Sequence, residues 1–212
     1  MITSQLVASD LLQIKAVFLR PNEPFIWASG IKSPIYCDNR LTLSDIAVRH
    51  DIEQGLAETI QREYPQAEVL MGTSTAGIAH AAITASILNL PMGYVRSGAK
   101  DHGRGNQIEG RLLPRQKVVV VEDLISTAGS CIEVAEILRQ AGADVLGVVS
   151  IFTYGMQKGL DRLAQARLTN HSLCDLDTLI DVAVEGGYIT KSDKKRLLRF
   201  RHNPTDEGWI NG

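Results

Sequence analysis

The chain has 212 residues and a formal net charge of −2, and 44% of its residues are hydrophobic. This length is enough to bury a core without disulfides or a metal, and the balanced charge excludes a broad basic surface for nucleic acid. The sequence shows no apolar run long enough to cross a bilayer, no signal-peptide pattern and no CxxC pair, which favours a cytoplasmic protein without nucleic-acid or membrane partners.

The N-terminal part of the sequence predicts two helices on either side of a small β-rich unit. Apolar residues at helical spacing predict a first helix over residues 4–19, which Pro21 would end. Residues 25–38 hold β-favouring side chains around a glycine and a proline, which indicates two short strands joined by a turn. A second helix is expected between Ser44, as its N-terminal cap, and Pro65.

Strands and helices alternate through the middle of the chain. The segments are, in order, EVLMG, GIAHAAITASILN, PMGYV, KVVVVED, CIEVAEILRQA and DVLGVVSIFTY. Continuous apolar runs suit parallel strands covered on both faces, so the pattern predicts an α/β fold with a mainly parallel twisted sheet flanked by helices. In such sheets ligands bind beyond the carboxyl ends of the strands.

Residues 118–130, VVVVEDLISTAGS, carry the most specific signal. A buried strand ends in Glu122 and Asp123, and a loop of small residues then opens a helix. Backbone N–H groups at the start of a helix bind phosphate, and the loop hydroxyls add donors. The two carboxylates suit ribose hydroxyls, either directly or through a hydrated Mg²⁺. The simpler alternative is a capped helix after a core strand, with both acids solvated.

This stretch resembles the phosphoribosyl diphosphate signature of the type I phosphoribosyltransferases. The resemblance implies that the loop holds the 5′-phosphate, that Glu122 and Asp123 contact the ribose hydroxyls, and that Asp123 is catalytic. It also implies Mg²⁺ as the cofactor, held mainly by substrate and water near the two acids rather than by direct protein ligands. The loop residues that it assigns to phosphoribosyl diphosphate are Leu124, Ile125, Ser126, Thr127, Ala128, Gly129 and Ser130. Ala128 departs from a loop that is often richer in glycine.

Residues 28–40, ASGIKSPIYCDNR, resemble the N-terminal hood motif of the orotate phosphoribosyltransferases. The resemblance implies a single type I phosphoribosyltransferase domain over residues 1–212. Its hood elements are expected at about 1–40, its core at about 44–170 and its C-terminal helices at about 175–201.

The hood resemblance also assigns substrate contacts. It places Lys32 near the diphosphate, although an exposed lysine in a β-turn is the alternative when that residue is considered alone. Contacts with orotate are expected from Tyr36, Ser126 and Tyr154. Some family members have an arginine near the position of Tyr154 that contacts the orotate carboxylate, so here the backbone N–H of Ser126 is a candidate for that contact.

Residues 94–110, YVRSGAKDHGRGNQIEG, resemble the flexible catalytic loop of the orotate enzymes. The resemblance implies that Lys100, Arg96 and His102 bind phosphoribosyl diphosphate and stabilise the departing diphosphate. It also implies a homodimer in which loop 97–110 closes over the active site of the neighbouring subunit. Without the resemblance, a solvated surface loop would explain the glycines and charges equally well.

GTSTAG, residues 72–77, predicts a second anion loop after a buried strand. Backbone N–H groups of Thr73, Ser74 and Thr75 would hold the diphosphate there. A tight turn between a strand and a helix is nearly as good an interpretation of this motif by itself.

Together the motifs imply displacement of diphosphate at ribose C1 by N1 of orotate, which forms orotidine 5′-monophosphate. Such displacements depend on positioning and on stabilisation of the charge that develops on the ribose and the leaving group. A phosphoribosyltransferase for another base is one alternative, and a non-catalytic sensor of phosphoribosyl diphosphate is another. The cations of the catalytic loop favour an enzyme.

Overall fold

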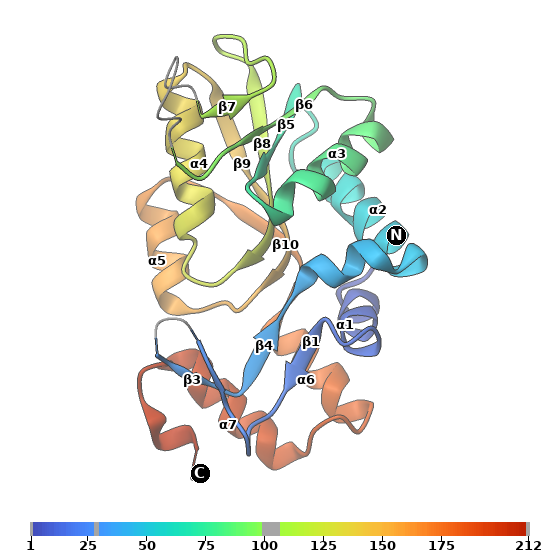
Figure 1. Ribbon diagram of the computed structural model, residues 1–212, viewed down its shortest axis with the longest axis vertical. Helices are drawn as coiled ribbons and strands as arrows, with labels where there is room; N and C mark the ends of the chain where they lie inside the picture. The colour runs from blue at the N-terminus through green and yellow to red at the C-terminus, as the bar shows by residue number, and fades with distance from the viewer. Residues whose placement is uncertain (1, 28–29, 99–106, 211–212) are drawn as a thin grey trace.

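A six-stranded sheet lies at the centre of the computed structural model, which describes residues 2–27, 30–98 and 107–210 (Figure 1). Its strand order is β10–β9–β8–β5–β6–β7, and all neighbours are parallel except β6 and β7. The strands are β5 (Val69–Thr73), β6 (Met92–Val95), β7 (Ile108–Glu109), β8 (Lys117–Ile125), β9 (Asp144–Thr153) and β10 (Asn170–Asp175). This sheet confirms the predicted α/β class.

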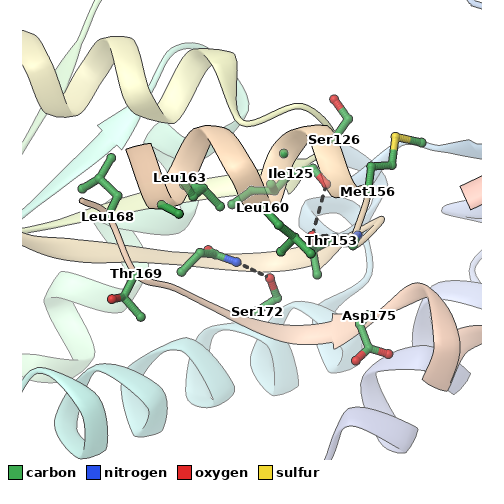
Figure 2. Close-up of a pocket in the computed structure, with 14 residues that line it drawn as sticks. Ile125, Ser126, Thr153, Met156, Leu160, Leu163, Leu168, Thr169, Ser172 and Asp175 are labelled. Atoms are coloured by element: carbon green, nitrogen blue, oxygen red, sulfur yellow. Dashed lines mark hydrogen bonds between the residues drawn. The ribbon is translucent and has the colours of Figure 1, made fainter. Parts of the chain in front are cut away.

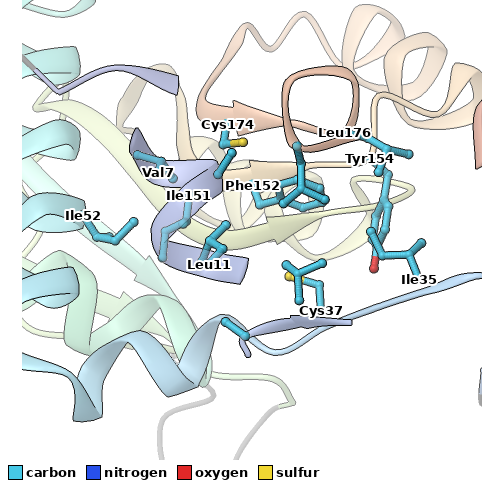
Figure 3. Close-up of a cluster of buried hydrophobic side chains, with 14 of the residues drawn as sticks. Val7, Leu11, Ile35, Cys37, Ile52, Ile151, Phe152, Tyr154, Cys174 and Leu176 are labelled. Carbon is cyan, nitrogen blue, oxygen red and sulfur yellow. The ribbon is translucent and has the colours of Figure 1, made fainter. Parts of the chain in front are cut away.

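Helices cover both faces of the sheet (Figure 1). Helices α1 (Ser4–Gln13), α2 (Ile46–Glu63) and α3 (Ala76–Leu88) lie on one face, and α4 (Gly129–Gln140) and α5 (Gln157–Gln165) lie on the other. Because successive side chains of a strand point to opposite faces, Val119 and Val121 join the core beneath α1–α3, whereas Val118 and Val120 join the core beneath α4. All four valines are fully buried. The larger of the two cores is drawn in Figure 3, where side chains of α1 and α2 meet those of β9.

A small hood of short strands lies beside the C-terminal helices, at the bottom of Figure 1. Strand β1 (Val17–Leu19) pairs antiparallel with β4 (Ile35–Cys37), and β2 (Phe25–Ile26) pairs antiparallel with β3 (Lys32–Ser33). The remaining elements are η1 (Asn39–Ser44), α6 (Leu176–Glu185), α7 (Lys191–His202) and η2 (Glu207–Trp209).

Arg196 of α7 fastens the hood to the end of the chain. Its guanidinium donates to the carbonyl of Pro21 in the hood and to the carbonyl of Ile210, the latter at 2.8 Å. The same guanidinium lies 5.9 Å from the centre of the Trp209 ring, which is fully buried and packs edge-on against Phe200 at 5.7 Å. Trp209 and Ile210 are therefore part of the hood's support.

The first helix is shorter than the sequence pattern predicts. Helix α1 ends at Gln13, and Lys15 turns the chain with a φ of 57°. The predicted helix over 4–19 is wrong beyond this point, because Val17–Leu19 carry β-favouring side chains and pair with β4 instead. The local apolar spacing suits either structure, and the pairing partner lies far along the chain.

Other boundaries also differ from the prediction. Helix α2 is capped by Asp45 rather than Ser44, since the Asp45 carboxylate accepts the N–H groups of Ala47 and Val48 at 3.1 Å. Helix α5 and the strands β7 and β10 were not predicted at all. The last two helices agree closely with the predicted C-terminal helices.

Candidate active site

The loops that follow β5 and β8 lie close together, because these two strands are parallel neighbours. Thr73, the last residue of β5, donates from Oγ1 to the Glu122 carboxylate at 2.6 Å and to the carbonyl of Val121 at 3.3 Å. The structure therefore brings together the two predicted anion loops, residues 73–75 and 126–130, beside the acidic pair at the end of β8.

Glu122 is buried, with 4% of its surface exposed, and its carboxylate joins three segments. Oε1 accepts hydrogen bonds from Thr73 Oγ1 and from the backbone N–H of Asp123, and Oε2 accepts one from Ser130 Oγ at 2.7 Å. A buried carboxylate needs such donors to offset its loss of hydration. Both oxygens thus accept hydrogen bonds from protein donors, and the Ser130 hydroxyl is one of these donors.

Asp123 is the more open of the two acids. Burial raises its pKa to about 7, and the hydrogen bond and charge of neighbouring Glu122 add to this effect. Its backbone carbonyl accepts a hydrogen bond of 2.7 Å from the buried amide of Asn39, which ties the acid to η1. A carboxyl group with a raised pKa is a good partner for a cation or a hydroxyl donor, because either of them stabilises the charged carboxylate.

Asn39 is a supporting residue that the sequence does not reveal. It is the next-to-last residue of the hood motif, and its amide oxygen also accepts the thiol hydrogen of Cys37 at 3.2 Å. The sequence shows only an asparagine that follows an acidic residue, and its partner lies 84 residues away.

The loop between β8 and α4 leaves backbone N–H groups open to an anion. No side chain caps the first turn of α4, and that turn contains no acidic residue. Ala128 precedes the helix with a φ of 58°, in the left-handed region that glycine adopts more easily. Unpaired N–H groups at a helix start, together with the helix dipole, favour binding of a phosphate group.

Helix α5 lies directly against this loop, which the sequence does not predict. A Cβ atom on Gly159 would lie 2.5 Å from the carbonyl oxygen of Ser126, so the backbones are in close contact. Arg162, one turn later, donates from Nη1 to the carbonyl of Thr127 at 3.0 Å.

The loop after β5 is held by β6 and by a close approach of α3. The backbone N–H of Ser74 donates to the carbonyl of Val95 at 3.3 Å, and the Ser74 hydroxyl donates to the same oxygen. The first turn of α3 has no side-chain cap, so its N–H groups are also open to an anion. A Cβ atom on Gly77 would lie 2.5 Å from Thr73 Oγ1, which explains the glycine.

The hood places its predicted residues in different surroundings. Lys32 forms an ion pair of 2.8 Å with Glu207 of the C-terminal turn, and both side chains are exposed. Tyr36 is 40% exposed on the hood surface. Tyr154, by contrast, is 3% exposed and packs on Trp27 at 5.6 Å, beside Ile35 and Cys37 of the hood (Figure 3). Burial raises the pKa of Tyr154 well above its usual value, and its ring belongs to the core on which the hood packs.

Of the three predicted cations of the catalytic loop, Arg96 lies in the described part of the chain. Its guanidinium forms an ion pair with Glu109 at 3.1 Å, and its backbone N–H donates to the carbonyl of Gln107 at 2.9 Å. These contacts join the two ends of the loop where it leaves and rejoins the sheet. Lys100 and His102 lie outside the described residues.

A groove of about 520 Å³ runs between α5 and the edge strand β10 (Figure 2). Ser126 and Met156 lie at one end of it, and Leu168 and Thr169 lie at the other. Its walls combine apolar residues of α5 with polar residues of β10, where the amide of Asn170 donates to the Ser172 hydroxyl at 2.8 Å. The groove therefore begins beside the phosphate loop.

The described residues contain no group of three or more His, Cys, Asp and Glu side chains that could hold a metal ion. The Asp123 carboxyl, with its raised pKa, suits instead a cation that substrate and water also bind. No helix in the same part of the chain is long and apolar enough to span a bilayer.

Comparison with known proteins yields consistent results. Residues 43–184 match the family described as the phosphoribosyl transferase domain. An orotate phosphoribosyltransferase of Bacillus cytotoxicus is 58% identical over 96% of this chain and 97% of the relative, and one of Bacillus subtilis is 56% identical over 99% and 97%. The crystal structure of orotate phosphoribosyltransferase from Aeropyrum pernix is 30% identical over 86% of this chain and 99% of that chain, with a TM-score of 0.75. The structure of Leishmania donovani UMP synthase has a TM-score of 0.79 at 24% identity and covers 93% of this chain and 42% of that chain, which supports the fold alone.

Proposed function

The chain belongs to the orotate phosphoribosyltransferase family, and from this premise we propose how its residues divide the work of the reaction. The protein transfers the 5-phosphoribosyl group from phosphoribosyl diphosphate to N1 of orotate, which gives orotidine 5′-monophosphate and diphosphate in the synthesis of UMP. The assignment of a role to each site residue rests mainly on the position of the acidic pair beside the two anion loops. This arrangement matches a ribose with phosphate groups at both ends.

The loop at residues 126–130 binds the 5′-phosphate, and residues 73–75 bind the diphosphate. Open N–H groups at the starts of α4 and α3 support these roles, since each helix start presents donors and a positive dipole end. Asp123 accepts a ribose hydroxyl. Glu122 holds the two loops at a fixed separation through its contacts with Thr73 and Ser130.

Mg²⁺ is the proposed cofactor, held mainly by the substrate's oxygens and water, with the Asp123 carboxylate near it. The ion would neutralise charge on the diphosphate. Burial beside Glu122 raises the pKa of Asp123, so a bound cation also keeps this carboxyl ionised near neutral pH. The protein's own task is to orient the ribose between the two loops.

Orotate binds between the hood and the phosphate loop. We assign Ser126 of the loop and Tyr36, which is 40% exposed on the hood, to contacts with orotate, while the buried Tyr154 supports the hood through its contact with Trp27. When diphosphate binds, Lys32 leaves its ion pair with Glu207 and pairs with the diphosphate instead. An exposed ion pair contributes only about 0–1 kcal/mol, so this exchange costs little.

The proposed active form is a homodimer in which Lys100, His102 and Arg96 stabilise the leaving diphosphate across the subunit boundary. Helix α3 supports this proposal, because its outer face bears Ala82, Ser86 and Ile87 and no charged side chain. A solvent-facing helix usually carries charge on that face, and a partner subunit would cover an apolar one.

The decisive assay follows the loss of orotate's ultraviolet absorbance in the presence of phosphoribosyl diphosphate and Mg²⁺, with each omitted in turn. Loss that requires both additions supports the proposal. Turnover of adenine or uracil, with orotate left unchanged, would instead assign the chain to another base.

A further inference from the structure

Helix α5 contacts the phosphate loop through its own backbone. Gly159 has no side chain, and a Cβ atom there would lie 2.5 Å from the carbonyl oxygen of Ser126 and 3.5 Å from the Cα atom of Thr127. Residues three apart on a helix share one face, so Arg162 reaches the loop from the same side as Gly159. The loop thus rests on a rigid element that contains none of the residues the family motifs assign.

Arg162 fastens this loop by a charge-assisted hydrogen bond. Its Nη1 donates to the carbonyl oxygen of Thr127 at 3.0 Å and also lies 3.4 Å from the place that a Cβ atom on Gly129 would occupy. The guanidinium therefore extends along the loop from Thr127 to the start of α4. Hydrogen bonds from a charged donor are stronger than neutral ones.

The loop needs such a fastening because of Ala128. This residue has a φ of 58°, a conformation that a side chain disfavours, and it lies between Thr127 and Gly129, the two residues that Arg162 contacts. Without the hydrogen bond, rotation of the Thr127 peptide can relieve the strain at Ala128. The N–H groups at the start of α4 would then no longer converge on one phosphate.

We infer that Arg162 is a positioning residue of the 5′-phosphate site, which holds loop 126–128 in its binding conformation. The inference rests on the proposed assignment of this loop to the 5′-phosphate. Because Arg162 acts on one loop only, it affects the two ends of phosphoribosyl diphosphate differently. Its removal weakens binding of the 5′-phosphate and leaves binding of diphosphate unchanged.

The test uses ribose 5-phosphate and diphosphate as separate competitive inhibitors against phosphoribosyl diphosphate. In Arg162→Gln, the inhibition constant of ribose 5-phosphate should rise on the order of tenfold, the loss expected for one hydrogen bond from a charged group. The constant for diphosphate should stay within about twofold, since its loop lies on β5. The KM for phosphoribosyl diphosphate should rise more than kcat falls. Arg162→Lys should restore part of the loss, because it keeps the charge and one donor.

Arg139→Gln is the matched control. Arg139 of α4 donates to the carbonyls of Ala166 and Arg167 at 2.8 and 3.1 Å, which fastens the opposite end of α5. The control also removes an arginine side chain that connects the α4 and α5 segments, but at the end of α5 that lies away from the loop. It should lower the melting temperature and leave both inhibition constants unchanged. Equal weakening of ribose 5-phosphate in Arg139→Gln and Arg162→Gln would overturn the inference, because general loosening of α5 would then explain both.

Thr127→Ala separates failure of the inference from failure of the proposed function. If this variant weakens ribose 5-phosphate and Arg162→Gln does not, the positioning role is wrong and the loop assignment stands. If neither variant weakens it, the 5′-phosphate binds elsewhere and both proposals fail.

Discussion

Glu122 links the two anion loops, and Glu122→Gln tests how much that link contributes. The carboxylate accepts three hydrogen bonds from Thr73, Asp123 and Ser130. In the variant, the amide oxygen can take the place of Oε1 and still accept from Thr73 and from the N–H of Asp123, and the Ser130 hydroxyl can turn to accept from the amide nitrogen, so the three hydrogen bonds remain but become neutral. Exchanging charged for neutral hydrogen bonds at a 4% exposed site should cost about 2–3 kcal/mol.

For a domain of this size, that loss lowers Tm by roughly 4–12 °C. Calorimetry of the substrate-free protein measures it directly, and the KM for phosphoribosyl diphosphate should rise in the same variant because the loops lose their fixed separation. Glu185→Gln is the control, since Glu185 is exposed on α6 and its replacement also removes one negative charge. An unchanged or higher Tm in Glu122→Gln would refute the reasoning. It would mean that burial of the charge costs as much as its hydrogen bonds contribute.

Three further predictions follow from other groups. Because the pKa of Asp123 is raised from 3.8 to about 7, the folded protein binds this proton more tightly than the unfolded chain, so stability should fall as pH rises from about 4 to 7. In Asp123→Asn this part of the Tm–pH profile should flatten, and a slope equal to that of the unmodified protein would contradict the assignment. Burial raises the pKa of Asp10 from 3.8 to about 6, helped by the charges of Asp51 and Asp45, so Asp10→Asn should raise Tm at pH 7–8 and have no effect below about pH 4. Ile87→Glu places a charge on the outer face of α3 and should convert a dimer to monomers in sedimentation, with loss of turnover; a dimer that persists would locate the interface elsewhere.

The sheet could be predicted because its signals are local. Four consecutive valines between charged residues identify a strand covered on both faces, and the acidic pair and small residues that follow locate the site at its carboxyl end. The order of the strands in the sheet was not predicted, because β8 pairs with β5 and not with β6, which comes between them in the sequence. That pairing depends on contacts between distant parts of the chain.

The missed features depend on contacts between distant residues. The strand at Val17–Leu19 exists because β4 lies beside it, and nothing in its own spacing separates it from the end of a helix. Arg162 and Asn39 donate to backbone carbonyl groups 35 and 84 residues away. Because every residue has a backbone carbonyl, the sequence does not show which one a side chain contacts. Tyr154 was predicted as an orotate contact, and its burial depends on packing against Trp27 of the hood, 127 residues earlier in the chain.

The attachment of the hood to Arg196 and the buried Trp209 bears on the order in which the protein folds. Pro21 lies near the start of the chain, and its partner Arg196 lies 175 residues later. Contacts of such large sequence separation form late, because a long loop must close first. A ribosome therefore synthesises all strands of the sheet before Arg196 and Trp209, so the hood should close only after these two residues have emerged.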